Sequence, residues 1–346
     1  MREIRIRGNE SGQRLDKFLA KYMGLAPKSF FYKMMRKKNI TLNGKKAQGN
    51  EQLKNGDVVK LFLSDETIEK FTEKQSAVKR GTFKKEKLDI LYEDEQVLLL
   101  NKPAGMLSQK AKPSDWSLVE YLTAYMLDSG QITEEDLKTF RPSVCNRLDR
   151  NTSGIVAAGK TLAALQELSQ MFRERTVRKY YLCLVHGTVT GERRIKGILT
   201  KDEKTNRVTV VRDGSGEASL SADIPGETTS AERLFGEGHF IETKYRALQS
   251  AKDVTLLEVH LITGKTHQIR AHLASEGHPI IGDYKYGIRT VNDRFQKKYG
   301  LASQLLHSYR LCFPECDGKL TALSGKEIKA PVPELFRKIC KDSGVM

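Results

Sequence analysis

The segment from Asn146 to Gly154, NRLDRNTSG, places one carboxylate, Asp149, between two guanidinium groups, those of Arg147 and Arg150. The residues that follow are Asn, Thr, Ser and Gly, which favour turns. Such a loop can keep a carboxylate ionised through the neighbouring cations and present it at the rim of a sheet. The spacing alone fits a structural turn with two solvated arginines even better. Residues elsewhere in the chain must therefore decide whether Asp149 is chemically active.

A second candidate cluster is the stretch TGKTHQIRAHLASEGHPIIGD. Its spacing predicts a helix from about Lys265 to Glu276, with His267 and Arg270 along one face and Ile269 and Leu273 along another. The apolar face can pack against the protein. The other face can direct the guanidinium of Arg270 at a partner.

Three histidines of this stretch, His267, His272 and His278, raise the question of a metal site. Their spacings match no standard helical zinc motif, and no nearby Cys or Glu completes a ligand set. We therefore expect no metal. A metal-dependent nuclease that uses these histidines remains an alternative, and activity in excess chelator would count against it.

The segment RKYYLCLVHG has the composition of a strand. Alternation along a strand directs Tyr180 to one face and Tyr181 to the other, so one of the two rings can enter a pocket. The usual role of such a tyrosine is to pack on the sheet, and nothing local separates the two roles.

The elements around these segments predict one large α+β unit built on a mostly antiparallel sheet. LDILYEDEQVLLLNKPAG reads as two strands and a loop, and TLLEVHLI alternates apolar with polar residues. SLVEYLTAYM and TLAALQELSQMF have helical spacing, the second with Thr161 as its N-cap. Regular alternation of strands and helices is absent, which argues against a doubly wound parallel sheet.

The first 63 residues predict a separate small unit. GQRLDKFLAKYM and PKSFFYKMMRKKN have helical spacing, ITLNGKKAQ reads as a hairpin with an Asn-Gly turn, and VVKLFL reads as a strand. This part holds fifteen Lys and Arg against five Asp and Glu, within a chain of net charge +16. The concentration of charge indicates a polyanion-binding module. Residues 64–87 are highly charged and aperiodic, as in a linker, and residues 88–346 form the large unit.

Composition narrows the class of protein further. With 39% hydrophobic and 29% charged residues among 346, the chain should fold as a globular protein. No apolar run approaches the length of a membrane span, and the N-terminus is charged from its second residue, so we expect neither a membrane protein nor a secretory signal. Five irregularly spaced cysteines favour free thiols in the cytoplasm. No glycine-rich phosphate-binding loop occurs.

Two resemblances follow from these segments. RLDKFLA, TLNGKK and NGDVV resemble the S-four-type RNA-binding domain. NKPAG, NRLDRNTSG, KYYLCLVHG, LITGKTHQIRAHLASEGHPIIGDYKYG, LLHSYRL and KAPVP, in this order, resemble the RluA-type pseudouridine synthases, which isomerise uridine in structured RNA. The resemblance covers roughly Leu88 to Phe336.

The resemblance implies a role for individual residues. It makes Asp149 the nucleophile, Arg270 its ion-pair partner and Tyr181 the aromatic that lines the target uracil. Arg147 resembles the residue that fills the gap left by the everted nucleotide. RNA contacts are expected from Arg147, Asn146, Arg150, Thr152, Lys265, His267, Gln268, Lys17, Lys28, Arg36, Lys37 and Lys38.

Two positions depart from the family pattern. Asn146 stands where His is typical, and Asn cannot titrate near neutrality; Lys265 stands where Arg is commoner. We expect both departures to affect which RNA is bound more than the chemistry.

Together these features predict a monomeric pseudouridine synthase that needs no cofactor or metal. Ribosomal RNA, and within it 23S RNA, is favoured over transfer RNA because of the attached RNA-binding module. The alternative is a non-catalytic RNA-binding or ribosome-assembly factor with the same fold, and the Asp149→Asn substitution separates the two.

Overall fold

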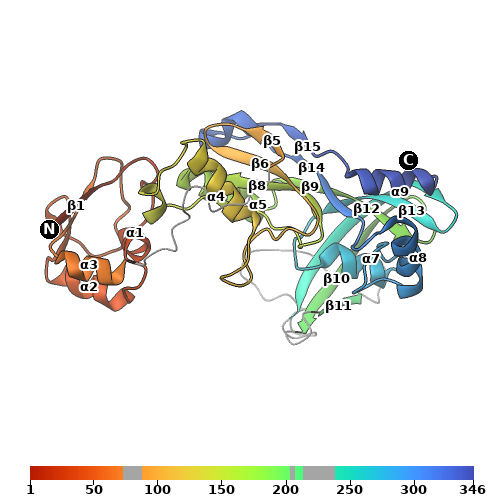
Figure 1. The fold of residues 1–346 in the computed structure, drawn as a ribbon, viewed down its shortest axis with the longest axis horizontal. Helices are drawn as coiled ribbons and strands as arrows, with labels where there is room; N and C mark the ends of the chain where they lie inside the picture. Colours follow the sequence, from red (N-terminus) through yellow and green to blue (C-terminus); the bar gives the residue numbers. More distant parts are fainter. Residues whose placement is uncertain (73–87, 203–206, 213–237) are drawn as a thin grey trace.

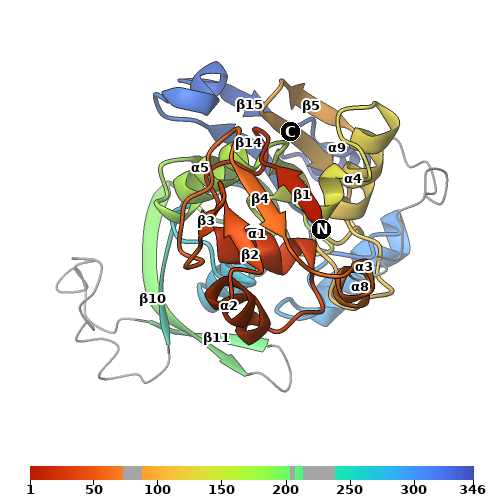
Figure 2. The same cartoon turned by 90° about the vertical axis from the view of Figure 1, so that its left-hand side faces the viewer.

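The computed structural model describes residues 1–72, 88–202, 207–212 and 238–346. Within these residues the chain forms two sheets, a small one near the N-terminus and a large one (Figure 1). The N-terminus lies in the small unit at one end of the molecule, and the C-terminus lies toward the other end. Figure 2 looks at the small unit from its own end, with the large sheet behind it.

The N-terminal unit has the two helices, the hairpin and the final strand that its sequence predicts. One further strand at its start, β1, was not predicted. The sheet order is β1-β4-β2-β3, and the pairs are antiparallel. The elements are β1 (Arg2–Arg5), α1 (Leu15–Tyr22), α2 (Lys28–Arg36), β2 (Ile40–Leu42), β3 (Lys45–Lys46), β4 (Val58–Leu61) and α3 (Asp65–Phe71).

The two helices follow their apolar spacing. Leu15, Phe18 and Leu19 of α1 are buried, and Phe31 and Met35 of α2 join them in one apolar cluster. Burial of this stripe leaves the lysines and arginines of the helices on the outside. The small unit therefore has its own core and a basic surface.

Helix α3 lies inside the segment 64–87, for which the sequence predicts a linker. The hydroxyl of Ser64 accepts a hydrogen bond from the backbone N–H of Thr67 at the start of the helix, and Ile68 is buried in the N-terminal core. Phe71 also packs against this core, with its ring centroid 4.7 Å from that of Phe30, so two apolar residues attach a short helix whose charged composition hides the signal. The remainder of the expected linker, 73–87, lies outside the described residues.

The large sheet confirms the predicted α+β class. Its described strands number 11, in the order β11-β10-β12-β13-β9-β14-β8-β6-β5, with β15 beside β14 and β7 beside β8. Among the described strands, only β8 and β14 pair in parallel. The strands are β5 (Ile90–Glu93), β6 (Val97–Lys102), β7 (Ser143–Val144), β8 (Ser153–Gly159), β9 (Arg178–His186), β10 (Glu192–Asp202), β11 (Arg207–Arg212), β12 (His239–Ala251), β13 (Val254–Leu261), β14 (Leu306–Cys312) and β15 (Glu327–Lys329).

Helices cover both faces of this sheet. They are α4 (Leu118–Asp128), η1 (Asp136–Lys138), α5 (Leu162–Arg173), α7 (Gln268–Ser275), α8 (Arg289–Tyr299), η2 (Gly318–Leu323) and α9 (Glu334–Asp342). The hydroxyl of Thr161 accepts a hydrogen bond from Ala164 N at 3.2 Å, which confirms the predicted cap of α5.

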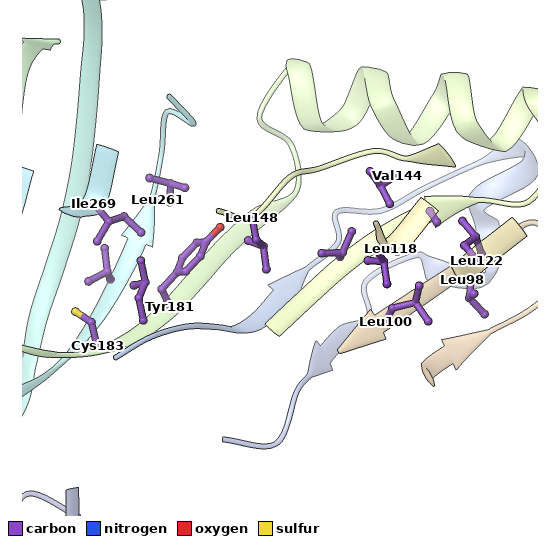
Figure 3. Packing of buried hydrophobic residues seen from close by; sticks show 14 of the residues in the cluster. Leu98, Leu100, Leu118, Leu122, Val144, Leu148, Tyr181, Cys183, Leu261 and Ile269 are labelled. Atoms are coloured by element: carbon purple, nitrogen blue, oxygen red, sulfur yellow. The ribbon is translucent and has the colours of Figure 1, made fainter. Parts of the chain in front are cut away.

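Strands β6 and β8 carry consecutive apolar residues, Val97 to Leu100 and Ile155 to Ala158, because each face meets a different core. Leu98 and Val156 pack into the cluster that includes α4, whereas Leu99 and Ile155 pack into the one that includes α5. Figure 3 shows the first cluster running from Leu98 at one end to Tyr181 and Ile269 at the other. This continuous core holds the strands and loops that carry the candidate site.

Strand β13 differs from its predicted pattern. The alternation predicts an exposed Glu258, but this residue is 6% exposed. Its carboxylate pairs with Arg246 and Arg310, both at 2.6 Å, so strand neighbours compensate its burial. The strands β10 and β12 were not predicted. No helix within the described residues has the length and apolar character to cross a bilayer.

Candidate functional site

Asp149 lies in the loop between β7 and β8, with 27% of its side chain exposed. The loop is held from one side by the segment that follows β6. The hydroxyl of Ser108 accepts a hydrogen bond from Leu148 N at 3.0 Å and donates one to Leu148 O at 2.9 Å. Gly105 N donates to Arg150 O at 2.9 Å. The residues on both sides of Asp149 are therefore fixed to the segment 105–108, Leu148 through the Ser108 hydroxyl and Arg150 through the backbone of Gly105.

Lys102 completes this attachment from inside the protein. Its side chain is fully buried, and Nζ donates to the carbonyl oxygens of Pro103, Met106 and Arg150 at 2.8 to 3.0 Å. Burial lowers the pKa of Lys102 to about 7, and the negative charge of Asp149 opposes that effect. Lys102 thus joins two loops at the base of the site.

The other end of the Asp149 loop is fixed by the contact between β8 and β14. Gly154 has a φ of +112°, and a Cβ atom there would lie 2.1 Å from the carbonyl oxygen of Ser308. Ser153 Oγ and His307 Nδ1 are 2.8 Å apart, and both residues are buried. Only glycine permits this approach of the two strands. The last G of NRLDRNTSG is therefore explained by packing.

Arg270 of α7 meets Asp149 across 121 residues of sequence. Arg270 Nη1 donates to Asp149 Oδ2 at 3.0 Å, and Nε and Nη2 bind the carboxylate of Asp283 at 2.7 and 2.9 Å. Burial lowers the pKa of Arg270, but the hydrogen bonds and charges of the two carboxylates outweigh it, so that the pKa is raised overall. The guanidinium therefore stays charged beside Asp149.

His267 also faces Asp149, but from outside the helix. The predicted helix begins at Gln268 and not near Lys265, because His267 has a left-handed backbone with φ of 55°. His267 Nδ1 is 3.0 Å from the hydroxyl of Tyr286, and Nε2 is 3.9 Å from Asp149 Oδ2. Burial, followed by the charges of neighbouring cations, lowers its pKa, while Asp149 opposes the shift. A neutral imidazole is thus favoured at neutral pH.

Tyr181 of β9 forms part of the wall of the same cavity. Its side chain is 5% exposed, and burial raises its pKa to about 12, so the phenol is un-ionised at neutral pH. In Figure 3 its hydroxyl points toward the loop that carries Leu148. The cavity has a volume of about 60 Å³ and is lined by Arg147, Leu148, Asp149, Thr152, Tyr181, Leu261, Lys265, His267, Gln268, Ile269, Arg270 and Leu306.

Eight residues that the sequence proposed for the site line this cavity. Of these, Arg147 and Lys265 are exposed, as is Arg150 outside the cavity, so their charges face solvent. The residues of the N-terminal unit that were expected to bind RNA, Lys17, Lys28, Arg36, Lys37 and Lys38, are exposed as well.

Three expected RNA contacts are occupied by the protein itself. The amide of Asn146 donates to Ile155 O at 3.1 Å and accepts from Ala157 N at 2.8 Å, so it pairs with the backbone of β8. Thr152 is buried and accepts from Gln304. Gln268 is buried and bonds to four groups: Thr263 Oγ1, Lys265 N, Glu242 O and Thr243 Oγ1. Polar residues in a motif can serve the backbone, which their type alone does not disclose.

The three histidines of the second cluster do not converge. His267 contacts Tyr286, His272 Nδ1 lies 3.1 Å from Thr243 Oγ1, and His278 Nδ1 lies 3.2 Å from the carbonyl oxygen of His186. Within the described part of the chain, no group of three or more His, Cys, Asp or Glu residues has an arrangement that could hold a metal ion.

Sequence reasoning missed Asp283, Lys102 and Ser108. All three lie in segments whose motifs were recognised, NKPAG with the residues that follow it and PIIGD, but a motif does not show which of its residues are buried against the site. The sequence offered one signal for two of them: Lys102 and Asp283 each stand next to a run of apolar residues, where a charged side chain is unusual.

Comparison with known proteins identifies the family of the chain. A profile of the RNA pseudouridylate synthase family matches residues 96–275, and one of the S4 domain matches residues 13–59. A protein of Vibrio vulnificus named ribosomal large subunit pseudouridine synthase C is 31% identical over 333 residues, which cover 95% of this chain and 92% of that protein. An uncharacterized RNA pseudouridine synthase of Mycoplasma genitalium is 32% identical over 306 residues, 88% of this chain and 87% of that one.

A solved structure shows the same fold. Human RNA pseudouridylate synthase domain containing 4 superposes with a TM-score of 0.54 at 22% identity, over 73% of this chain and 92% of that protein. The family match, the relatives and the fold agree, and this chain accordingly belongs to the RNA pseudouridylate synthase family, isomerases that act on uridine in RNA, and carries an S4 domain before its catalytic unit.

Proposed function

We propose that this chain converts specific uridines of large-subunit ribosomal RNA to pseudouridine, with Asp149 as the carboxylate that starts the reaction. The substrate follows from relatives named ribosomal large subunit pseudouridine synthase C in several Vibrio species. The role of Asp149 is supported by its contact with Arg270 at 3.0 Å on the wall of a partly open cavity. This single contact carries the catalytic assignment.

The chemistry requires no oxidant and no added atom. The bond between C1′ and N1 of uridine breaks, C1′ joins C5 of the rotated uracil, C5 loses its proton to solvent and N1 gains one. Ionised Asp149 attacks C1′ as a nucleophile, or it removes a proton from the sugar and opens an elimination route. Both routes need a carboxylate that is partly shielded from water and close to a cation, and Asp149 is 27% exposed and 3.0 Å from Arg270 Nη1.

Arg270 and Tyr181 are assigned to the same step. The charged guanidinium donates a hydrogen bond to Asp149 at 3.0 Å and orients its carboxylate toward the cavity. The ring of Tyr181, which is buried and un-ionised, supplies an apolar wall for the uracil. Because the target atoms are unreachable in a stacked helix, the nucleotide must be everted, and the exposed Arg147 at the cavity occupies the space that it leaves.

RNA is held at two places in this proposal. Near the cavity, Arg147, Arg150 and Lys265 offer exposed charges for phosphates. At a distance, the S4 domain offers Lys17, Lys28, Arg36, Lys37 and Lys38. In this proposal an RNA-binding unit at 1–63 holds the RNA at a distance, and a catalytic unit at 88–346 holds it next to the cavity. We further propose that the protein works as a monomer in the cytoplasm without metal or cofactor, since the reaction needs none.

The release of tritium tests the catalytic role. A large-subunit ribosomal RNA transcript carrying uridine tritiated at C5 releases the label only when C5 forms its new bond. Wild-type protein should release it, and Asp149→Asn should lower the rate by at least about 10⁴-fold while RNA affinity stays within about twofold, because the amide is isosteric but uncharged. Arg150→Ala is the matched control beside it, and it should lose affinity with little change in the rate of the bound complex.

Two results would contradict the proposal. Tritium release by Asp149→Asn at the wild-type rate would remove Asp149 from the chemistry. Wild-type protein that binds the transcript but releases no label, and leaves the total RNA of its own cells unmodified, would instead favour a non-catalytic RNA-binding factor.

A further inference from the structure

Arg270 binds two carboxylates, of which only Asp149 belongs to the proposed chemistry. The second, Asp283, is 1% exposed and binds the guanidinium through two hydrogen bonds, Nε to Oδ2 at 2.7 Å and Nη2 to Oδ1 at 2.9 Å. The bond from Arg270 to Asp149 is single and longer, at 3.0 Å. The stronger and more buried contact of Arg270 is therefore with Asp283.

Backbone groups hold the Asp283 carboxylate in place. Its Oδ1 accepts hydrogen bonds from Lys285 N at 2.9 Å and Tyr286 N at 3.1 Å. Its main-chain carbonyl accepts from Gly287 N at 2.8 Å and from the side-chain amide of Asn292 at 2.9 Å. A side chain fixed at both ends in this way has one available position.

The shape of the guanidinium transfers that position to Asp149. A planar guanidinium that uses Nε and one N–H of Nη2 for one carboxylate keeps its Nη1 donors at a fixed angle to that carboxylate, and Nη1 is the atom that meets Asp149. The ring of Tyr286 lies 5.2 Å from the guanidinium carbon and limits movement out of the plane. Asp283 thus determines the direction of the one donor that reaches Asp149.

Charge gives a second consequence. Two carboxylates on one guanidinium leave a net negative charge on the group of three, whereas Asp149 alone with Arg270 would form a neutral pair. In a neutral pair the guanidinium would hold the Asp149 carboxylate more tightly, and the carboxylate would be a weaker nucleophile or base. By sharing the charge of Arg270, Asp283 weakens the electrostatic attraction between Arg270 and Asp149 but leaves their hydrogen bond in place.

We infer that Asp283 is a positioning residue of this enzyme, which orients Arg270 and shares its charge so that Asp149 keeps its hydrogen bond to Arg270 and remains reactive. This inference rests on the proposed role of Asp149. Asp283 itself lies behind Arg270 and does not touch the substrate.

A double-mutant cycle tests it with the tritium assay. Asp283→Asn should lower kcat by about 10²-fold or more with KM within about threefold, because a misdirected donor affects the transition state and not RNA binding. Arg270→Lys should lose a similar amount. The double variant should be no slower than Arg270→Lys alone, since Asp283 acts through Arg270. The inference would be overturned if the fold-losses in kcat of the two single variants multiplied in the double variant. A wild-type kcat for Asp283→Asn would overturn it as well.

Folding is checked separately. The thermal midpoint and RNA affinity of Asp283→Asn are measured beside those of wild type, and a variant that does not fold is replaced by Asp283→Glu. That change keeps the charge and moves the carboxylate by one methylene, so it should still lower kcat at unchanged RNA affinity. Full kcat in the folded Asp283→Glu protein refutes the positioning role.

The two proposals fail in different ways. Absence of tritium release by wild-type protein would refute the proposed function. Release by wild type, its loss in Asp149→Asn and its full retention in Asp283→Asn would refute only the role of Asp283.

Discussion

Asp149, Arg270 and Asp283 come from three parts of the chain, and their side chains meet in one group of hydrogen bonds. Each alone has an ordinary role: a loop aspartate, a helix arginine and a turn aspartate. The contact places one guanidinium between a buried carboxylate and a half-exposed one. This difference in exposure agrees with the cavity, whose lining includes Asp149 and not Asp283.

Asn146 gives a prediction at this scale. Its amide pairs with Ile155 O and Ala157 N, so Asn146→Ala should lower the free energy of unfolding by about 1 to 3 kcal/mol, because two backbone groups of β8 lose a partner. RNA affinity should be unchanged. Urea denaturation and filter binding measure the two effects. The neighbouring exposed Arg147 is the control, and Arg147→Ala should show the reverse: weaker RNA binding at unchanged stability.

At the scale of elements, the parallel contact between β8 and β14 fixes the end of the loop that carries Asp149. It depends on Gly154, which allows the close approach, and on the buried pair of Ser153 and His307. The side chain of His307 is fully buried. This strand contact directly follows Thr152 and Leu306 of the cavity wall, and it therefore limits where Asp149 can lie.

His307 makes this contact sensitive to acid. Burial, partly opposed by the carbonyl of Ala330, lowers its pKa from 6.5 to about 4. Between these values the unfolded chain binds a proton that the folded protein does not, so stability is fully present above pH 6.5 and is lost as pH falls toward 4. The loss from this group is about 3 kcal/mol.

The His307→Asn variant isolates that contribution. Asparagine can keep the hydrogen bond to Ser153 but does not titrate. Urea unfolding at several pH values should give a smaller decline in stability from pH 6.5 to 4 for the variant than for wild type. Parallel declines would show that His307 is not the group responsible.

At the scale of the whole molecule, two units with different tasks share one chain. The basic S4 domain has its own core, and the large sheet carries the cavity (Figure 1). Residues 1–63 carry most of the excess positive charge, whereas Asp149, the proposed catalytic carboxylate, belongs to the large unit. Such a separation lets RNA affinity be altered without changing the rearrangement step.

Charge removal on the S4 domain tests this separation. Replacing Lys37 and Lys38 by alanine should weaken RNA binding and reduce the slope of log affinity against log salt by about 2, because two phosphate contacts are lost. The rate of tritium release at saturating enzyme should stay at the wild-type value. The matched control replaces Lys338 and Lys341 of α9, which are also exposed, and should leave the slope unchanged. An equal change in both variants would mean that only net charge matters.

The amino-acid sequence by itself determined the fold class, the two basic helices of the N-terminal unit and the segments that form the cavity. These depend on local periodicity and on short motifs, which are properties of neighbouring residues. It also led to Asp149, Arg270 and Tyr181 as members of one site through a resemblance and not through their spacing.

Only the tertiary structure decided which polar residues serve the backbone and which face the cavity. Asn146 and Gln268 were expected at the RNA and instead bond to the protein, whereas Asp283, unnoticed in the sequence, holds Arg270. Burial and hydrogen-bond partners are set by strands and helices that meet across more than a hundred residues. That information is not present in any local stretch, because it depends on packing of the complete chain.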